Sequence, residues 1–542
     1  MNLEEACRTA DSAVFAKTGH HLTDVQMLIL RGALLGQTYT QIAASSHYSV
    51  SYIKKFAGPA LWQLLSQGLG EEVSKTSFQA ALKRVALRPS VQAPRPQPEV
   101  SSDRHTPPRL AAVPNPSMFF GRDRELASLH QGIVQDHCRV VMVSGIGGIG
   151  KTTLLARFAR EYSVEFDWVV FQSLGDAPML LHVLSELLQA WLGSQATLPD
   201  HVQGHMQLFL ELLKTHRCLI VLDQVEGILQ SGELTGQYRQ ECHQFGEFFQ
   251  QLAQGDHRSC LALLGRELPA ALVALAGDEL PIRHLKVRGL MPEAAQQLLQ
   301  VKGVNTTQAG IAELIQMQRG NPLALQIVAT TIQELFGGNV AQLLKQGTII
   351  IGDTLLNLLN EQFERLSDLE KGVIYWLALE QQSLAQLREN TRFLVTSSSE
   401  LLKTLQSLKR RSLLEEEPIS EAGESSFTLQ PIVARYVLKQ LITQACTDVL
   451  TTIQTQSIRN LGLLRTHILF REDQFYQRRH TQTQPVVSSL MSELQICLGD
   501  ERTLQQHLND LLVGLHEKTT QAIGFATRNV VNLQHILESQ RL

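Results

Sequence analysis

The feature that most constrains the fold is a glycine-rich segment at residues 145–152. It reads GIGGIGKT and matches the pattern GxxxxGK[ST] at every fixed position. An apolar run, Val140–Val143, precedes this segment, and a helix-like run, Thr153–Phe158, follows it. A phosphate-binding loop of this pattern joins a strand to a helix. The strand-like run before the segment and the helix-like run after it therefore distinguish it from a chance glycine-rich turn. The segment therefore predicts a strand, a phosphate-binding loop and a helix.

Each residue type in this loop has a physical role in holding phosphate. Glycines let backbone amides approach phosphate oxygens because no Cβ stands in the way. The N-terminus of the following helix adds a partial positive charge. We expect Lys151 to reach the β- and γ-phosphates and the Thr152 hydroxyl to coordinate Mg²⁺. The predicted nucleotide-binding residues of this segment are Gly145, Gly147, Gly148, Ile149, Gly150, Lys151, Thr152 and Thr153.

A nucleotide site of this kind also needs a carboxylate for the metal. The run Cys218–Asp223 reads CLIVLD, an apolar strand that ends in an acid. We expect Asp223 to hold Mg²⁺ through water, so that Thr152 and Asp223 form the metal site. The next residue is Gln224, which cannot act as a base, and Glu226 need not point at the site. The sequence therefore predicts a weak ATPase with slow or partner-dependent hydrolysis.

The surrounding sequence has the pattern of a multidomain α/β protein. Over residues 118–350 apolar strand-like runs alternate with helical stretches, as in a parallel sheet covered by helices. From about residue 351 the helical period dominates. The predicted strands are Arg139–Ser144, Trp168–Gln172, Cys218–Asp223, Cys260–Leu264 and Arg283–Val287.

A proline-rich stretch divides the chain. Eight of the 28 residues from Pro89 to Pro116 are proline, and proline resists both helix and sheet interiors. We predict an extended, semi-rigid linker there, with a ligand for a proline-binding module as the alternative. Residues 1–88 look all-helical.

Residues 38–56 have the spacing of a helix-turn-helix. Ile42 and Ala43 take the packed positions of the first helix, where a small residue is needed at the crossing. Ile53 and Phe56 take those of the second helix. Residues 1–88 hold nine Lys+Arg against six Asp+Glu, a low surplus for a DNA-reading domain. Protein docking and sequence-specific DNA binding therefore both stay open.

Further motifs resemble, in the right order, the NB-ARC family of STAND signalling ATPases over about residues 118–440. Residues 119–126 (FFGRDREL) look like the motif before the phosphate loop, and residues 264–267 (LGRE) look like the sensor segment. Residues 320–325 (GNPLAL) resemble the Gly-Leu-Pro-Leu motif. The N-terminal region resembles the helix-turn-helix domain that precedes NB-ARC modules in cyanobacterial-type proteins. The resemblance implies a five-stranded parallel sheet with the sensor strand between the phosphate-loop strand and the Asp223 strand.

The resemblance also implies roles for three residues outside the loop. It places Arg266 close to the γ-phosphate, where a guanidinium distinguishes ATP from ADP, and so adds it to Lys151 and Asp223 as a catalytic residue. Arg122 would lie by the adenine, and Pro322 would close the adenine pocket from a helical lid. A plain surface position for Arg266 and a helix-start role for Pro322 are the alternatives.

The family continues with a winged helix, and two segments look like parts of it. Residues 401–414 resemble its recognition-helix portion, and residues 427–437 resemble its closing strand and helix. Many relatives carry Met-His-Asp there, with the His on the ADP β-phosphate, whereas this chain has Gln430, which can donate only a neutral hydrogen bond. Residues 524–533 resemble a segment that in relatives precedes sensor repeats. We expect a member without such repeats, a sensor on a separate protein, or a truncated gene.

Composition limits the kinds of binding partner and the cellular compartment that we expect for this protein. The 48 Lys+Arg against 52 Asp+Glu give a net charge of −4, which excludes a surface that is basic throughout. No run of 18 apolar residues occurs, so no membrane-spanning helix is expected. The acidic start MNLEE is unlike a secretory signal, and the seven cysteines form no CxxC pair and are predicted to be buried reduced thiols. These features favour the cytoplasm.

These expectations define a domain order and a function. The predicted domains are a helix-turn-helix-like domain (1–88), a linker (89–116), a P-loop nucleotide-binding domain (117–288), a helical lid (289–350), a winged helix (351–444) and a C-terminal helical region (445–542). We predict an ATP/ADP switch in signal transduction that is closed with ADP and self-associates with ATP, under an unidentified protein signal or effector. The alternative is a nucleotide-regulated, DNA-binding transcriptional regulator acting through residues 38–56. An AAA+-type motor is disfavoured by Gln224 and by the lid and winged-helix motifs.

Overall fold

The chain forms two compact units, Met1–Arg104 and His105–Leu542. The computed structural model describes residues 110–539 except 112, 115, 117, 194, 347–351, 419–424, 470–482, 500 and 517–522. Among the first 109 residues it describes 24–34, 37–44, 58–69 and the single positions 6, 10, 14, 22, 73, 78 and 81.

The first unit packs three described helices around a small apolar core. They are α2 (Asp24–Leu34), α3 (Tyr39–Ala44) and α5 (Gly58–Leu69). Ile42 of α3 is buried, as predicted. The close approach to α3 is made by Gly32 of α2, because a Cβ there would lie 2.5 Å from the Ile42 side chain. The side chain of Ala43 and residues 45–57, which include the predicted second helix, lie outside the described part of the chain.

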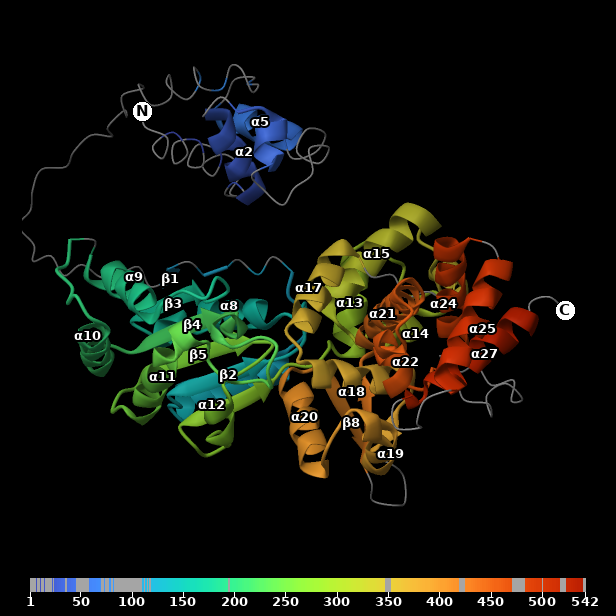
Figure 1. The fold of residues 1–542 in the computed structure, drawn as a ribbon. Helices are drawn as coiled ribbons and strands as arrows, with labels where there is room; N and C mark the ends of the chain where they lie inside the picture. Colours follow the sequence, from blue (N-terminus) through green and yellow to red (C-terminus); the bar gives the residue numbers. More distant parts are fainter. Residues whose placement is uncertain are drawn as a thin grey trace, which may run out of the picture. The chain divides into compact units, whose positions relative to one another are not determined.

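The second unit is built on a parallel sheet with the strand order β1-β3-β4-β5-β2-β6 (Figure 1). All five predicted strands are present. β5 lies between β4 and β2, which confirms the expected place of the sensor strand, so the carboxyl ends of these three strands meet at one edge. The strands are β1 (Leu110–Ala111), β2 (Val140–Ser144), β3 (Trp168–Ser173), β4 (Cys218–Asp223), β5 (Cys260–Gly265) and β6 (Ile282–Lys286).

The short strand β1 corrects one predicted boundary. Leu110–Ala111 pairs with β3 in parallel register, so the chain joins the sheet inside residues 89–116, the predicted linker. Arg160 also donates a hydrogen bond to the Pro114 carbonyl at 3.2 Å. Proline-rich chain is extended, and an extended segment at a sheet edge can add a short strand there.

Helices cover both faces of this sheet, because successive strand residues point to opposite sides. Val141 and Val143 of β2 belong to one apolar core, and Val140 and Met142 belong to the other. The first face is covered by α7 (Asp123–Leu129), the π-helical turn η2 (His130–Gln135) and α8 (Lys151–Glu161). The second is covered by α9 (Leu180–Leu192), α10 (Val202–Thr215), α11 (Gln244–Gln254) and α12 (Ala270–Ala274).

Helices that follow the sheet form a lid with its own apolar core. The helix α15 begins with Asn321 as its N-cap and Pro322 in its first turn, where the missing proline N–H has no helical partner to lose. The described lid helices lie within residues 289–350, the predicted lid. They are α13 (Pro292–Val301), α14 (Ile311–Met317), α15 (Pro322–Phe336) and α16 (Val340–Lys345).

A three-stranded antiparallel sheet, β7-β9-β8, and its helices follow the lid. The helix α20 and the strand β9 fall on the segments predicted to be a recognition helix and a closing strand. One helix, α21, runs through residue 444, the predicted end of the winged helix. The elements are α17 (Asp353–Glu364), α18 (Asp368–Leu379), β7 (Gln382–Ser383), α19 (Leu384–Asn390), α20 (Ser398–Arg410), β8 (Leu414–Pro418), β9 (Ser425–Leu429) and α21 (Pro431–Thr455).

The C-terminal helices share one apolar core with this antiparallel module. His467 marks the junction: it is buried, and its ring stacks on Trp376 of α18 with centroids 5.2 Å apart. It is therefore a packing histidine. The helices are α22 (Gly462–Thr466), α24 (Thr483–Leu498), α25 (Glu501–His516) and α27 (Ala526–Ser539).

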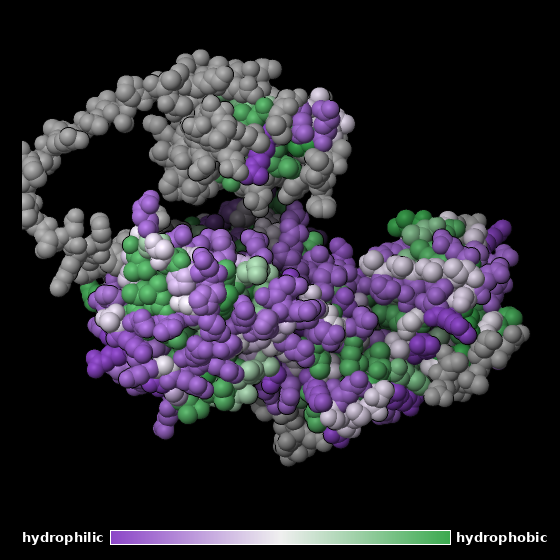
Figure 2. All heavy atoms as spheres, turned by 60° about the vertical axis from the view of Figure 1, so that its left-hand side comes forward, coloured by the Kyte–Doolittle hydropathy of each residue, from purple (hydrophilic) through white to green (hydrophobic). Residues whose placement is uncertain are grey.

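The surface and the cysteines agree with the composition. Figure 2 shows hydrophilic side chains over most of one face of the second unit, with smaller hydrophobic patches between them. None of the described helices is both long and apolar enough to cross a bilayer. Of the six described cysteines five are buried free thiols, and Cys497 is an exposed one.

Candidate functional site

The phosphate loop opens into a cavity of about 390 Å³ at the carboxyl edge of the sheet. The cavity is walled by the loop, by the ends of β4 and β5, by the lid and by α17. Gly148 and Gly150 have φ of 75° and 95°, which glycine adopts without strain. Of the predicted site residues, Gly145 alone is outside the lining. Those that line it are Arg122, Gly147, Gly148, Ile149, Gly150, Lys151, Thr152, Thr153, Asp223, Arg266 and Pro322.

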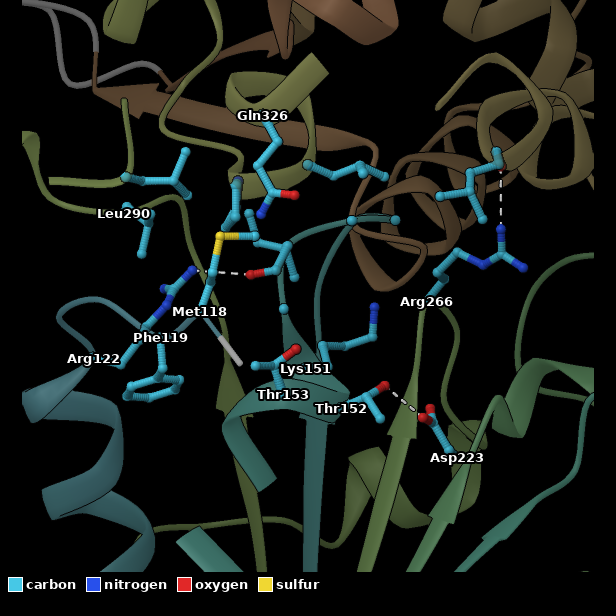
Figure 3. Close-up of a pocket in the computed structure, with 18 of the residues that line it drawn as sticks. Met118, Phe119, Arg122, Lys151, Thr152, Thr153, Asp223, Arg266, Leu290 and Gln326 are labelled. Atoms are coloured by element: carbon cyan, nitrogen blue, oxygen red, sulfur yellow. Dashed lines mark hydrogen bonds between the residues drawn. The ribbon is translucent and has the colours of Figure 1, made fainter. Parts of the chain in front are cut away.

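Lys151 starts the helix after the loop, and its amine lies at the centre of the site (Figure 3). Its Nζ donates to the carbonyl oxygens of Gly145 at 2.9 Å and Ile146 at 3.3 Å. Burial lowers the pKa of Lys151 to about 8, although the carboxylates of Glu226 and Asp223 raise it. The site therefore holds a desolvated cation whose charge an anionic ligand would stabilise.

Thr152 and Asp223 meet, as the metal-site prediction requires. Thr152 Oγ1 donates to Asp223 Oδ2 at 2.5 Å (Figure 3), and burial raises the pKa of Asp223. A hydroxyl and one carboxylate fit Mg²⁺, which binds few protein groups beside phosphates and water. Among the described residues no cluster of three or more His, Cys, Asp and Glu could hold a metal alone. The pair therefore suits an ion that arrives with a nucleotide.

Neither Gln224 nor Glu226, the two polar residues after Asp223, is placed to act as a general base. Gln224 has φ 58°, and its Oε1 accepts a hydrogen bond from Ser173 Oγ at 3.0 Å. Glu226 is buried and lines the cavity. Its two oxygens are taken by Arg266, at 2.7 Å from Nε and 3.0 Å from the backbone N.

Arg266 joins the end of the sensor strand to α17. Beyond Glu226, its Nη1 donates to the Leu358 carbonyl at 3.1 Å (Figure 3). Its Nη2 donates to Glu361 at 3.2 Å. It is thus not a plain surface arginine. The resemblance placed it near a γ-phosphate, and in the structure it lines the cavity while each of its three guanidinium nitrogens donates to a protein acceptor.

Arg122 and Pro322 lie toward the lid side of the cavity. The Arg122 guanidinium donates to the carbonyls of Ile149 at 3.0 Å and Arg288 at 2.6 Å. Its backbone is left-handed, with φ 75°, a strained conformation for a residue with a side chain. Apolar side chains such as Leu290 line the cavity beside them (Figure 3), which suits a flat aromatic base.

Sequence reasoning missed two residues that shape the cavity. Asn321 of the lid donates from Nδ2 to the Gly147 carbonyl at 3.1 Å, and Leu358 of α17 lies against Gly147. The signal for Asn321 was present, since it stands where the Gly-Leu-Pro-Leu motif has leucine. No sequence signal pointed to Leu358, because its contact depends on how α17 docks.

Gln430, which stands where many relatives have the histidine, has its hydrogen-bond partner on a neighbouring strand. Its Nε2 donates to Glu415 of β8 at 3.0 Å, and Gln430 is outside the cavity lining. Glu415 is in turn 3.8 Å from Arg319. Gln430 therefore binds within its own module and does not contact the cavity.

Two family models match this sequence. Residues 122–231 match the NB-ARC domain, a range that includes the phosphate loop and Asp223. Residues 1–85 match the N-terminal helix-turn-helix of vWA-MoxR associated proteins, which confirms the N-terminal resemblance. The motifs beyond residue 231 lie outside these matches.

One similar protein can be aligned with more of the chain than these two models. An uncharacterized WD repeat-containing protein from Nostoc sp. is 35% identical over 479 residues, which is 81% of this chain and 38% of that protein. This chain therefore spans well under half of that relative's length.

Solved structures are more distant. The Walker-type ATPase of Pyrococcus abyssi is 14% identical with a TM-score of 0.41, covering 59% of this chain and 96% of its own. A STAND protein with a tetratricopeptide repeat sensor from Pyrococcus horikoshii is 16% identical with a TM-score of 0.32, covering 80% of this chain and 66% of its own.

Proposed function

We propose that this chain, which belongs to the NB-ARC family of P-loop ATPases, works as an ATP/ADP-driven molecular switch in signal transduction. The observation that carries this proposal is the position of Arg266. It lines the cavity, and it also binds the Leu358 carbonyl and Glu361 of α17. A ligand phosphate that attracts this guanidinium competes with the contacts that dock α17 on the sheet.

The two nucleotides would act through this competition. ADP leaves Arg266 on α17 and stabilises the closed arrangement of sheet, lid and antiparallel module. The additional phosphate of ATP draws Arg266 away and favours an open, self-associating form. ATP shifts this equilibrium only if it binds the open form more tightly than the closed one. Mg²⁺ held by Thr152 and Asp223 would neutralise phosphate charge.

Hydrolysis would be slow and would serve to reset the switch. Gln224 carries no basic group, and Glu226, the nearest other candidate, is paired with Arg266. A water molecule at the γ-phosphate would therefore lack a free carboxylate in this closed form. A turnover above roughly 1 s⁻¹ for the isolated protein, the low end for ordinary enzymes, would contradict this part of the proposal.

Oligomer size tests the switch. The protein is loaded with ADP or with a non-hydrolysable ATP analogue, both with Mg²⁺, and its mass is measured by light scattering. The proposal expects a monomer with ADP and a larger assembly with the analogue. Equal mass with both ligands, although both are bound, would overturn the switch and leave nucleotide binding intact.

A second candidate function is nucleotide-controlled DNA binding through the N-terminal domain. The match of residues 1–85 to a helix-turn-helix favours it. Binding to duplex DNA that falls steeply with salt and differs between ADP and ATP would support this candidate. Absence of binding at low salt would leave protein docking as the role of the domain.

A further inference from the structure

The lid contacts the phosphate loop through two successive carbonyl groups. Asn321 Nδ2 donates to the Gly147 carbonyl at 3.1 Å, and the Leu323 backbone N–H approaches the Gly148 carbonyl at 3.4 Å. The contact is tight, because a Cβ on Gly148 would lie 2.7 Å from Leu323 Cβ. The loop's shape is therefore linked to the position of the lid.

Asn321 performs two tasks at this point. Its Oδ1 accepts hydrogen bonds from the backbone N–H groups of Leu323 at 3.1 Å and Ala324 at 3.2 Å, which caps α15. Its Nδ2 makes the bond to Gly147. Asn321 is 1% exposed. Both ends of its amide therefore bind protein groups and not water. A leucine, the residue of the Gly-Leu-Pro-Leu motif, could do neither.

Holding this carbonyl has a consequence for phosphate binding. In a trans peptide the carbonyl and the following N–H point in opposite directions. Fixing the Gly147 carbonyl therefore fixes the direction of the Gly148 N–H, and the loop binds phosphate through such N–H groups. Lys151 holds the two preceding carbonyls, those of Gly145 and Ile146.

We infer that Asn321 is a positioning residue for nucleotide binding: its side-chain amide keeps the phosphate loop in its binding shape for as long as the lid is docked. The inference rests on the proposed nucleotide function and adds to it a direct route from lid position to phosphate affinity. A movement of the lid away from the loop would release the Gly147 carbonyl and weaken the grip on the phosphates. The opening proposed for ATP, which separates α17 from the sheet, therefore leaves the lid docked on the loop.

The test separates the clamp from the helix cap. Asn321→Ser keeps an oxygen that caps α15, but its shorter side chain cannot reach Gly147. The matched control is Asn339→Ser, since Asn339 caps the neighbouring lid helix α16 by accepting from the Gln342 N–H at 3.1 Å and is outside the cavity lining. Both full-length variants are compared with wild type by ADP titration calorimetry and by hydrogen exchange of residues 145–150 without nucleotide.

We expect Asn321→Ser to weaken ADP binding by about tenfold, the loss that follows when one buried hydrogen bond is broken. Exchange in the loop should rise, while Asn339→Ser should change neither. Wild-type affinity and loop exchange in Asn321→Ser, or equal losses in both variants, would overturn the inference. The exchange measurement needs no ligand, so it tests the clamp even if wild-type protein binds no ADP, a result that would instead overturn the proposed function.

Discussion

At the scale of single residues, two buried basic groups carry measurable consequences. Lys151 is surrounded by loop carbonyls, and burial lowers its pKa to about 8. His467 stacks on Trp376, and burial lowers its pKa to about 4. The first residue belongs to the candidate site, and the second belongs to the junction with the C-terminal helices.

Nucleotide affinity should fall as the pH rises above 8. A phosphate is bound by the protonated amine, and above pH 8 Lys151 has to take up a proton before it binds. The dissociation constant for ADP should therefore rise by up to about tenfold per pH unit above that value. Calorimetry in buffers of different ionisation enthalpy should show proton uptake at pH 8.5. In Lys151→Arg the uptake should vanish, because arginine stays charged; identical proton uptake in the variant would contradict this assignment.

The folded state should lose stability in acid through His467. Its pKa is below the usual value of 6.5, so as the pH falls the unfolded chain binds the proton first. This contribution is complete above about pH 6.5 and is lost as the pH falls to about 4, by at most about 3 kcal/mol. Denaturation of His467→Phe, which keeps the stacking but cannot titrate, should depend less on pH in this window. An unchanged slope in the variant would show that other groups dominate.

At the scale of elements, a buried ion-pair network joins the nucleotide-binding sheet to the antiparallel module. Arg411, after α20, pairs with Glu267, which follows Arg266, and with Glu370 of α18 at 2.9 Å from its Nε. Arg365, after α17, also donates to Glu267, at 2.7 Å. Arg411, Glu267 and Glu370 are fully buried.

Removing one charge of this network should lower the stability of the fold more than removing two opposite charges together. Arg411→Met leaves two carboxylates buried with fewer partners, which typically costs about 3–5 kcal/mol. The thermal unfolding midpoint should fall by several degrees. Adding Glu370→Gln should recover part of this loss, because it removes one of the buried negative charges. If the double variant lost as much stability as the two single variants lose together, the three residues would not act as a network.

The sequence predicted the secondary-structure elements better than it predicted how those elements pack on one another. Apolar runs placed β2 to β6 within one or two residues, because buried parallel strands have a strong compositional signal. The loop and Asp223 were also predicted, since motif and topology bring them together. The docking of some elements was not predicted: α17 reaches the loop through Leu358, and Gln430 binds Glu415 of β8. Such contacts depend on tertiary packing and leave no local pattern.

At the scale of the whole second unit, the cavity has a wall from each module. The sheet supplies Lys151 and Arg266, the lid supplies Pro322, and α17 supplies Leu358. A ligand there contacts groups that hold the modules together, so binding energy can be coupled to their arrangement. This is the physical basis for a switch, and it requires that the cavity hold a nucleotide in the purified protein.

The nucleotide content of freshly purified protein tests this requirement most directly. The protein is denatured, and the released nucleotide is identified and quantified by chromatography, alongside Lys151→Ala as the control. We expect nearly equimolar ADP in the wild type and little in the variant. A wild-type protein that is empty and takes up no added ADP, or a variant that retains ADP fully, would contradict it.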